Sequence, residues 1–135
     1  MARRLIVDTG VLIASERERR AIGSFIEPDD DVAVAAVTVA ELHTGVELAA
    51  EPRRASRLEF VRAALELLPV EVYDTKVAEA HARLLAHVHR AGRPRGAHDL
   101  LIAATAVATD RTVLTTDRAA GFDELPGVTC LFGGV

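Results

Sequence analysis

Five short runs of apolar and β-branched residues recur along the chain, and each is bounded by polar or turn-forming residues. They cover residues 5–7, 32–37, 70–73, 112–117 and 128–132. The first two are continuously apolar rather than alternating, which is typical of parallel strands that are covered on both faces. We therefore interpret the five runs as short strands of one buried sheet.

Apolar residues at helical spacing fill the stretches between these runs. They predict helices over residues 11–18, 38–50, 52–68, 75–91 and 99–109. Pro52 suits the first turn of the third helix, and Asp74 can cap the fourth. Alternating strands and helices predict an α/β fold with a mainly parallel sheet and helices on both faces. No repeat or linker interrupts the pattern, so we expect residues 1–135 to form a single domain.

The segment between the fourth and fifth predicted helices has an unusual composition. It spans residues 89–99, and its glycines and proline disfavour a continuous helix: Gly92, Pro94 and Gly96. The segment also carries three arginines, Arg90, Arg93 and Arg95. Arginine can bind phosphate oxygens through two N–H groups at once, so this loop is our candidate for contact with an RNA backbone. Two alternatives stay open: the arginines keep a loop soluble, or they pair with acidic residues of a partner.

Four acidic residues fall where the predicted elements begin or end. Asp8 and Asp117 end the first and fourth strands, whereas Glu41 and Asp99 lie in the first turns of two helices. Because the carboxyl ends of parallel strands share one edge of a sheet, all four side chains can converge there. A purely structural interpretation also exists for three of them. Asp8 and Asp99 can cap helices, and Glu41 can form a capping box with Thr38.

Composition narrows the chemistry that this edge of the sheet can carry. The chain is 50% hydrophobic and 4% aromatic, with a single cysteine, Cys130, and a formal net charge of −4. The scarcity of aromatic residues excludes a base-stacking platform, and the lone cysteine excludes an internal disulfide and cysteine-based zinc sites. Nucleic-acid binding must then be electrostatic or metal-mediated, through a local positive charge. No apolar stretch approaches the roughly 20 residues of a membrane span, so we expect a soluble cytoplasmic protein.

A cluster of carboxylates at one edge requires compensation of its charge. Packed carboxylates repel one another unless a cation binds or their pKa values rise. Oxygen donors without cysteine or paired histidine favour Mg²⁺ or Mn²⁺ over zinc. A second acidic group, Asp29, Asp30 and Asp31, occupies a turn with Pro28, and we interpret these three side chains as solvent-facing.

Four stretches together resemble the PIN domain, specifically the short VapC-type toxin ribonucleases of toxin–antitoxin pairs. They are residues 6–14 (IVDTGVLIA), 38–42 (TVAEL), 98–106 (HDLLIAATA) and 114–117 (LTTD). The resemblance covers nearly the whole chain, and the order and separation of the four motifs make the set specific. It implies a PIN-like three-layer α/β/α fold whose five-stranded parallel sheet has the order 3-2-1-4-5.

The resemblance also assigns roles to individual residues. The family's catalytic acidic positions and the hydroxyls beside them match six residues here: Asp8, Glu41, Asp99, Asp117, Thr9 and Thr115. Asp8 and Asp99 are expected to bind Mg²⁺ or Mn²⁺ directly, and Glu41 and Asp117 to bind it directly or through water, or to activate the nucleophile. Gly10 stands where a serine is common, which removes a helper hydroxyl but no metal ligand. Family members are generally metal-dependent endoribonucleases, usually dimeric, and a VapB-type antitoxin restrains them by inserting a segment near the acidic pocket.

Two other functions fit parts of the same pattern. A phosphatase-like α/β domain also places aspartates at strand ends. It requires an Asp-x-Asp pair after the first strand, and the second position of that pair is Gly10 here. A catalytically inert PIN-like module would bind RNA or a protein without turnover, and the four intact acidic positions argue against it. We therefore predict an endoribonuclease that cuts RNA phosphodiester bonds with a metal-activated water.

Overall fold

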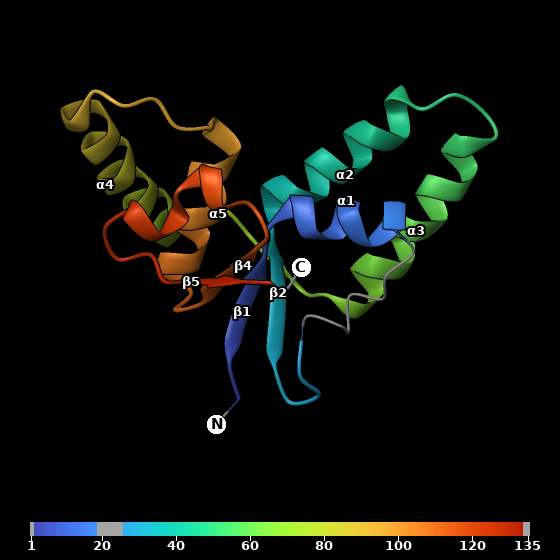
Figure 1. The fold of residues 1–135 in the computed structure, drawn as a ribbon, viewed down its shortest axis with the longest axis horizontal. Helices are drawn as coiled ribbons and strands as arrows, with labels where there is room; N and C mark the ends of the chain where they lie inside the picture. Colours follow the sequence, from blue (N-terminus) through green and yellow to red (C-terminus); the bar gives the residue numbers. More distant parts are fainter. Residues whose placement is uncertain (1, 19–25, 134–135) are drawn as a thin grey trace.

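A computed structural model describes residues 2–18 and 26–133 of the chain (Figure 1). The strands are β1 (Arg4–Val7), β2 (Asp31–Ala35), β3 (Val70–Glu71), β4 (Thr112–Thr115) and β5 (Cys130–Phe132). The α-helices are α1 (Thr9–Glu18), α2 (Ala36–Leu48), α3 (Arg53–Leu67), α4 (Thr75–Ala91) and α5 (Ala97–Ala108). In the described ranges, no helix has both the length and the apolar character needed to cross a membrane.

The five strands form one parallel sheet, which has β1 at its centre. Their order is β3-β2-β1-β4-β5, and this confirms the predicted order 3-2-1-4-5. In the register of the sheet, Ile6 of β1 pairs with Ala33 of β2 on one side and with Val113 of β4 on the other. All strands therefore present their carboxyl ends at the same edge, and this is the edge at which ligands bind in open α/β sheets.

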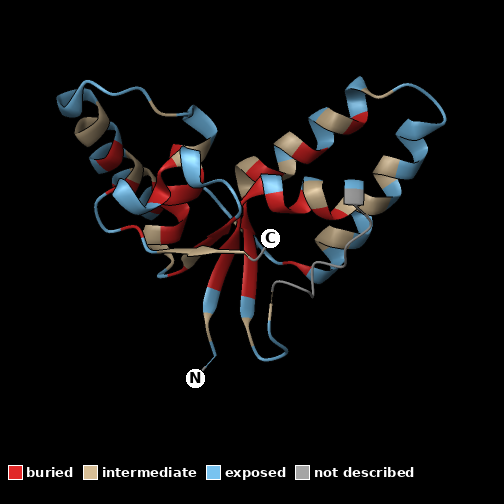
Figure 2. Ribbon diagram, viewed as in Figure 1, coloured by how far each residue is buried: buried red, intermediate tan, exposed pale blue. Residues whose placement is uncertain are grey.

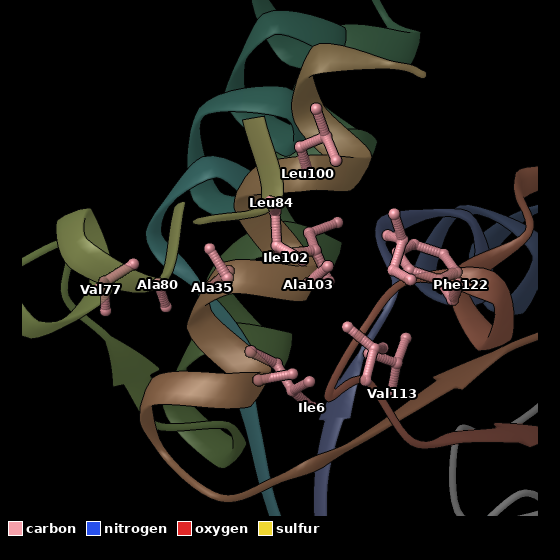
Figure 3. Close-up of a cluster of buried hydrophobic side chains, with 14 residues drawn as sticks. Ile6, Ala35, Val77, Ala80, Leu84, Leu100, Ile102, Ala103, Val113 and Phe122 are labelled. Atoms are coloured by element: carbon pink, nitrogen blue, oxygen red, sulfur yellow. The ribbon is translucent and has the colours of Figure 1, made fainter. Parts of the chain in front are cut away.

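Helices cover both faces of the sheet, so the three-layer α/β/α architecture is confirmed (Figure 1). Leu5 and Val7 point into a hydrophobic cluster with α1, α2 and α3, whereas Ile6 points into the cluster formed with α4 and α5. Figure 3 shows Ile6, Val113 and the small side chain of Ala103 of α5 within this second cluster. Burial concentrates in the strands and in the helix faces turned toward them (Figure 2). The continuous apolar character of β1 follows from this two-sided cover.

The junction between β2 and α2 lies two residues earlier than the sequence predicts. The strand ends at Ala35 and the helix begins at Ala36, and the N-cap residue Ala35 makes no side-chain cap bond. Thr38 consequently lies inside the helix, where it is buried and its hydroxyl forms a 2.9 Å hydrogen bond with that of Thr9. The predicted capping box of Thr38 and Glu41 is therefore wrong, because a contact with α1 engages the threonine hydroxyl.

The remaining differences concern the ends of elements. Helix α5 begins at Ala97 instead of residue 99, and β3 and β5 are shorter than the predicted runs.

Asp74 caps α4 as predicted, because its Oδ1 accepts the backbone N–H of Val77 at 3.0 Å. The predicted loop between β4 and β5 contains two short 3-10 helices, Arg118–Ala120 and Phe122–Glu124. Phe122, the aromatic residue of this connection, is buried in the core (Figure 3).

The acidic turn before β2 is partly buried, which corrects the prediction that all its aspartates face solvent. The side chain of Asp30 is 1% exposed and accepts hydrogen bonds from Nε and Nη2 of Arg3, at 2.9 and 2.5 Å. This bond from Arg3 lowers the pKa of Asp30 to about 2. Asp31 pairs with Arg4 and Arg111, and Asp29 is exposed. The arginine before β1 thus ties the turn to the central strand.

Candidate active site

The structure brings the four predicted acidic residues together at the carboxyl edge of the sheet. Asp8 follows β1, and Asp117 follows the end of the neighbouring strand β4. Glu41 lies in the second turn of α2, and Asp99 lies in the first turn of α5. The negative charges of Asp8, Asp117 and Glu41 all raise the pKa of Asp99, so the four carboxylates share one electrostatic environment.

Asp8 is the most deeply placed of the four carboxylates. The residue is 7% exposed, and its Oδ2 accepts a 2.8 Å hydrogen bond from the buried hydroxyl of Thr115. Its backbone N–H donates to the carbonyl of Leu114, which continues the pairing of β1 with β4. Burial raises the pKa of Asp8, the bond from Thr115 lowers it, and the charges of Glu41 and Asp117 raise it further. The net effect is a raised pKa, and a bound cation would relieve the cost of the ionised form.

Asp99 reaches the same edge of the sheet from α5 without serving as the helix cap. The N-cap residue of α5 is Gly96, and the Asp99 carboxylate accepts no hydrogen bond from the described residues. Burial is the main cause that raises its pKa, followed by the charges of its acidic neighbours. A Cβ atom on residue 96 would lie 2.9 Å from Oδ2 of Asp99, so Gly96 provides space for this carboxylate. The capping interpretation of Asp99 is therefore wrong.

Both carboxylate oxygens of Glu41 are engaged by side chains from other helices. The hydroxyl of Thr9, at the start of α1, donates to Oε1 at 2.7 Å. Nδ1 of His98, in the first turn of α5, lies 3.1 Å from Oε2. Sequence reasoning missed His98, and the available signal was its position directly before Asp99 in the motif at residues 98–106.

Asp117 differs from Asp8 although both follow strands. It is exposed, and its Oδ1 accepts the backbone N–H of Ala120, so it caps the 3-10 helix Arg118–Ala120. Its own backbone N–H donates to Oγ1 of Thr115 at 3.0 Å. The Thr115 hydroxyl therefore links the chain at Asp117 to the carboxylate of Asp8.

The donor set fits a hard divalent cation. Its four carboxylates supply oxygen ligands, which Mg²⁺ and Mn²⁺ prefer. Among the described residues that act on the pKa of Asp99, His98 is the one that lowers it, and no lysine or arginine is among them. Within residues 2–18 and 26–133, the only three acidic residues whose ligand oxygens all lie within 4.8 Å of one another are Glu27, Asp29 and Asp30, in the surface turn before β2, so the four carboxylates at the sheet edge are more widely spaced. Asp30 there is already paired with Arg3, so that turn does not compete as a site.

The arginines of the predicted phosphate-binding loop have different surroundings. Nη1 of Arg95 donates to the backbone carbonyls of residues 120 and 121, at 2.9 and 3.1 Å, and Nη2 pairs with Glu124 at 2.9 Å. Its side chain is only 14% exposed. Arg90 lies in the last turn of α4 and Arg93 lies in the loop, and both are exposed. The structure thus places Arg95 against the connection from β4 to β5, and leaves Arg90 and Arg93 accessible to a phosphate.

A groove of about 690 Å³ borders Glu41 on the side of α1, α2 and α3. Apolar side chains line part of it, including Ile13 and Phe60, and two exposed arginines, Arg17 and Arg53, also border it. The groove therefore combines an apolar surface with positive charge directly beside the acidic site.

Comparison with known proteins relates this geometry to a family. The model of the PIN domain matches residues 5–128. Ribonuclease VapC5 of Mycobacterium tuberculosis is 40% identical over 116 residues, which are 83% of this chain and 82% of the relative. The crystal structure of a member of the VapBC family of toxin–antitoxin systems, VapBC-5 from Mycobacterium tuberculosis, has a TM-score of 0.75 at 33% identity and covers 98% of both chains.

A further solved structure supports the fold alone. VapBC2 from Rickettsia felis, bound to a DNA fragment from their promoter, has a TM-score of 0.87 and covers 97% of this chain and 99% of that chain. Its sequence identity is only 18%. The match of the PIN-domain model and the 40% identical relative establish that the chain belongs to the PIN-domain family, and within it to the VapC-type ribonucleases.

Proposed function

We propose that this protein is a divalent-metal-dependent endoribonuclease and the toxin of a toxin–antitoxin pair. The observation that carries the proposal is the convergence of Asp8, Glu41, Asp99 and Asp117 at the carboxyl edge of a PIN-domain sheet. Four carboxylates with mutually unfavourable charges favour binding of a cation. The ribonuclease and the toxin–antitoxin complex to which the chain is similar support the same reaction and the same biological context.

The carboxylates of Asp8 and Asp99 are suited to hold the ion. Asp8 and Asp99 both have raised pKa values, chiefly because of burial, and the charge of Asp8 acts on Asp99. Mg²⁺ or Mn²⁺ bound there would neutralise charge on the scissile phosphate and promote ionisation of the attacking water. Thr115 keeps the Asp8 carboxylate oriented through the 2.8 Å hydrogen bond.

The carboxylates of Glu41 and Asp117 are suited to orient the attacking water. The Glu41 side chain is 27% exposed, and Asp117 is exposed. Either can bind the ion through water, or orient the nucleophile and accept its proton. Thr9 holds one oxygen of Glu41 and leaves the second lone pair of that oxygen available.

Substrate RNA needs local attraction, because the protein carries a net charge of −4. Arg90 and Arg93 supply it in our proposal, since both are exposed and precede Asp99 in the chain. Arginine contacts to phosphate oxygens position an RNA backbone without reading its sequence. Arg95, which we predicted as a third contact, acts here by holding the connection from β4 to β5.

The protein partner in this proposal is a VapB-type antitoxin. The groove beside Glu41 suits an inhibitory segment, because its apolar lining and exposed arginines match an amphipathic peptide with acidic residues. Occupation of this groove would place the segment next to the acidic site and restrain cleavage. A homodimer, which the resemblance implies, remains part of the proposal and is measured by light scattering after size-exclusion chromatography.

The deciding experiment incubates the purified, partner-free protein with structured RNA in Mg²⁺ or in EDTA. We expect cleavage only in Mg²⁺, and none by Asp99→Asn. The matched control is Asp29→Asn, which makes the same change at an exposed aspartate in the turn before β2 and should cleave at the wild-type rate. Hydrolysis of a small phosphomonoester without RNA cleavage would instead support a phosphatase. RNA binding without turnover by the wild-type protein would support an inert binding module.

A further inference from the structure

The proposed metal ligands Asp8 and Asp99 each have a neighbour in the chain that contacts Glu41. Thr9 follows Asp8, and its hydroxyl donates to Oε1 of Glu41 at 2.7 Å. His98 precedes Asp99, and its Nδ1 lies 3.1 Å from Oε2 of the same carboxylate. The two oxygens of Glu41 are thus contacted from α1 and from α5, one on each side.

The chemistry of the contact determines which nitrogen of His98 carries the proton. An ionised carboxylate can only accept hydrogen bonds, so Nδ1 of His98 must be the donor. In the neutral imidazole this leaves Nε2 without a proton. Because the His98 side chain is 60% exposed, the bond contributes little to folding stability, and its main consequence is the position of the Glu41 carboxylate.

Glu41 needs such a restraint because its carboxylate is flexible and surrounded by like charges. A glutamate side chain has several rotatable bonds, and its charge repels those of Asp8 and Asp99. A single contact with Thr9 would leave Oε2 able to rotate away from Asp8 and Asp99. The contact with His98 prevents this movement by joining the second turn of α2 to the first turn of α5.

We propose that His98 is a positioning residue, whose Nδ1–H holds the Glu41 carboxylate in register with Asp8 and Asp99 for binding the divalent ion. This inference rests on the proposed function for the identity of the ion. Groups that orient ligands of a metal commonly change its affinity by about 10-fold or more when they are removed. His98 would act through Glu41, without touching the substrate.

The test compares three variants by isothermal titration with Mn²⁺ alone, at pH 8. His98→Ala should weaken Mn²⁺ binding by about 10-fold. His98→Asn should stay within about threefold of wild type, because its amide nitrogen branches from Cγ as Nδ1 does and can donate to the same oxygen. His89→Ala, at an exposed histidine of α4, is the matched control and should bind as wild type does. Equal weakening by His98→Ala and His98→Asn would overturn the proposal, as would unchanged affinity in His98→Ala.

A double-mutant cycle separates an effect through Glu41 from a general effect of the ring. In a Glu41→Ala background, His98→Ala should cause no further loss of Mn²⁺ affinity, because the carboxylate that it positions is gone. A loss of the same size in both backgrounds contradicts the proposal. The melting temperature in EDTA should change by no more than about 2 °C in His98→Ala, since the bond is exposed.

A metal-free measurement keeps this inference distinct from the proposed function. At pH 8, the ¹⁵N spectrum of the imidazole should show the Nδ1–H tautomer of His98 in the wild-type protein and its loss in Glu41→Ala. This pair of spectra tests the contact even if the wild-type protein fails to cleave RNA, a result that would count against the endoribonuclease alone. An Nε2–H tautomer of His98 in the wild-type protein would overturn the inference.

Discussion

The hydroxyl of Thr115, at the end of β4, donates a 2.8 Å hydrogen bond to the carboxylate of Asp8, at the end of the neighbouring strand β1. The parallel register that pairs Val7 with Leu114 brings the next residue of each strand to this position. Thr115 is fully buried, and the same hydroxyl oxygen accepts the backbone N–H of Asp117. One side chain therefore holds a buried carboxylate and the start of the following turn.

Replacement of this hydroxyl should destabilise the metal-free protein. We expect Thr115→Val to lower the free energy of unfolding by about 1–3 kcal/mol at pH 7, because a buried charged acceptor and a backbone N–H both lose their partner. Thr112→Val makes the same change at the other end of β4, where the hydroxyl bonds Thr129 at an exposed position, and should cost at most about 0.5 kcal/mol. Urea denaturation in EDTA measures both variants. Equal losses in the two would show that the Asp8 contact adds no stability.

Removal of the Asp8 charge should have opposite effects with and without metal. The folded-state pKa of Asp8 is raised, first by burial, so its ionisation disfavours the folded state increasingly as the pH rises above the unfolded value of about 4. Asp8→Asn should therefore melt a few degrees higher than wild type in EDTA at pH 7, and the difference should vanish below about pH 4. In saturating Mg²⁺ the order should reverse, because only the wild-type protein gains stability from binding. Calorimetry under these conditions measures the difference in melting temperature between Asp8→Asn and wild type. A lower melting temperature of Asp8→Asn in EDTA at pH 7 would contradict the prediction.

The ion pair of Asp30 with Arg3 should show the reverse dependence on pH. The pKa of Asp30 is lowered to about 2, mainly by the hydrogen bond from Arg3, so its contribution is present above the unfolded pKa of about 4. That contribution is lost as the pH falls from about 4 to about 2. Asp30→Asn should cost about 1 kcal/mol at pH 6, at the upper end for ion pairs near the surface, and progressively less in acid. Asp29→Asn, at an exposed neighbour, is the control, and a cost for Asp30→Asn that does not decline with pH would exclude the ion pair as its cause.

Single substitutions should separate the two roles of the arginines before Asp99. Arg93→Ala should weaken RNA binding, leave Mg²⁺ affinity and stability nearly unchanged, and reduce the salt slope of log K by about one. Arg95→Ala should instead destabilise the fold by about 1–3 kcal/mol, because two backbone carbonyls and Glu124 lose their donor. Filter binding of RNA across salt concentrations and urea denaturation measure the two effects. An unchanged salt slope and RNA affinity in Arg93→Ala would remove Arg93 from the proposed contacts.

The arrangement of elements could be predicted from local pattern because it depends on local properties. The continuous apolar runs at residues 5–7 and 32–37 and the helical spacing between runs reflect burial on both faces of a sheet. Asp8 directly follows a strand, and Asp99 lies in the first turn of a helix. From such positions the sequence predicts at which edge of the sheet each carboxylate lies. The strand order came from the resemblance of four motifs to one family, and the structure confirms it.

The partners of polar side chains were decided by tertiary structure alone. Thr38 bonds a residue 29 positions away, and Glu41 contacts a histidine 57 positions away, so neither pairing follows from local spacing. The predicted capping box is wrong for this reason, because the Thr38 hydroxyl bonds Thr9 of another helix instead of the backbone of its own helix. Arg95 similarly gained two carbonyls and a carboxylate about 25 to 29 residues further along the chain. A hydrogen bond needs its two atoms within about 3 Å, and only the packed helices and strands bring such distant residues that close.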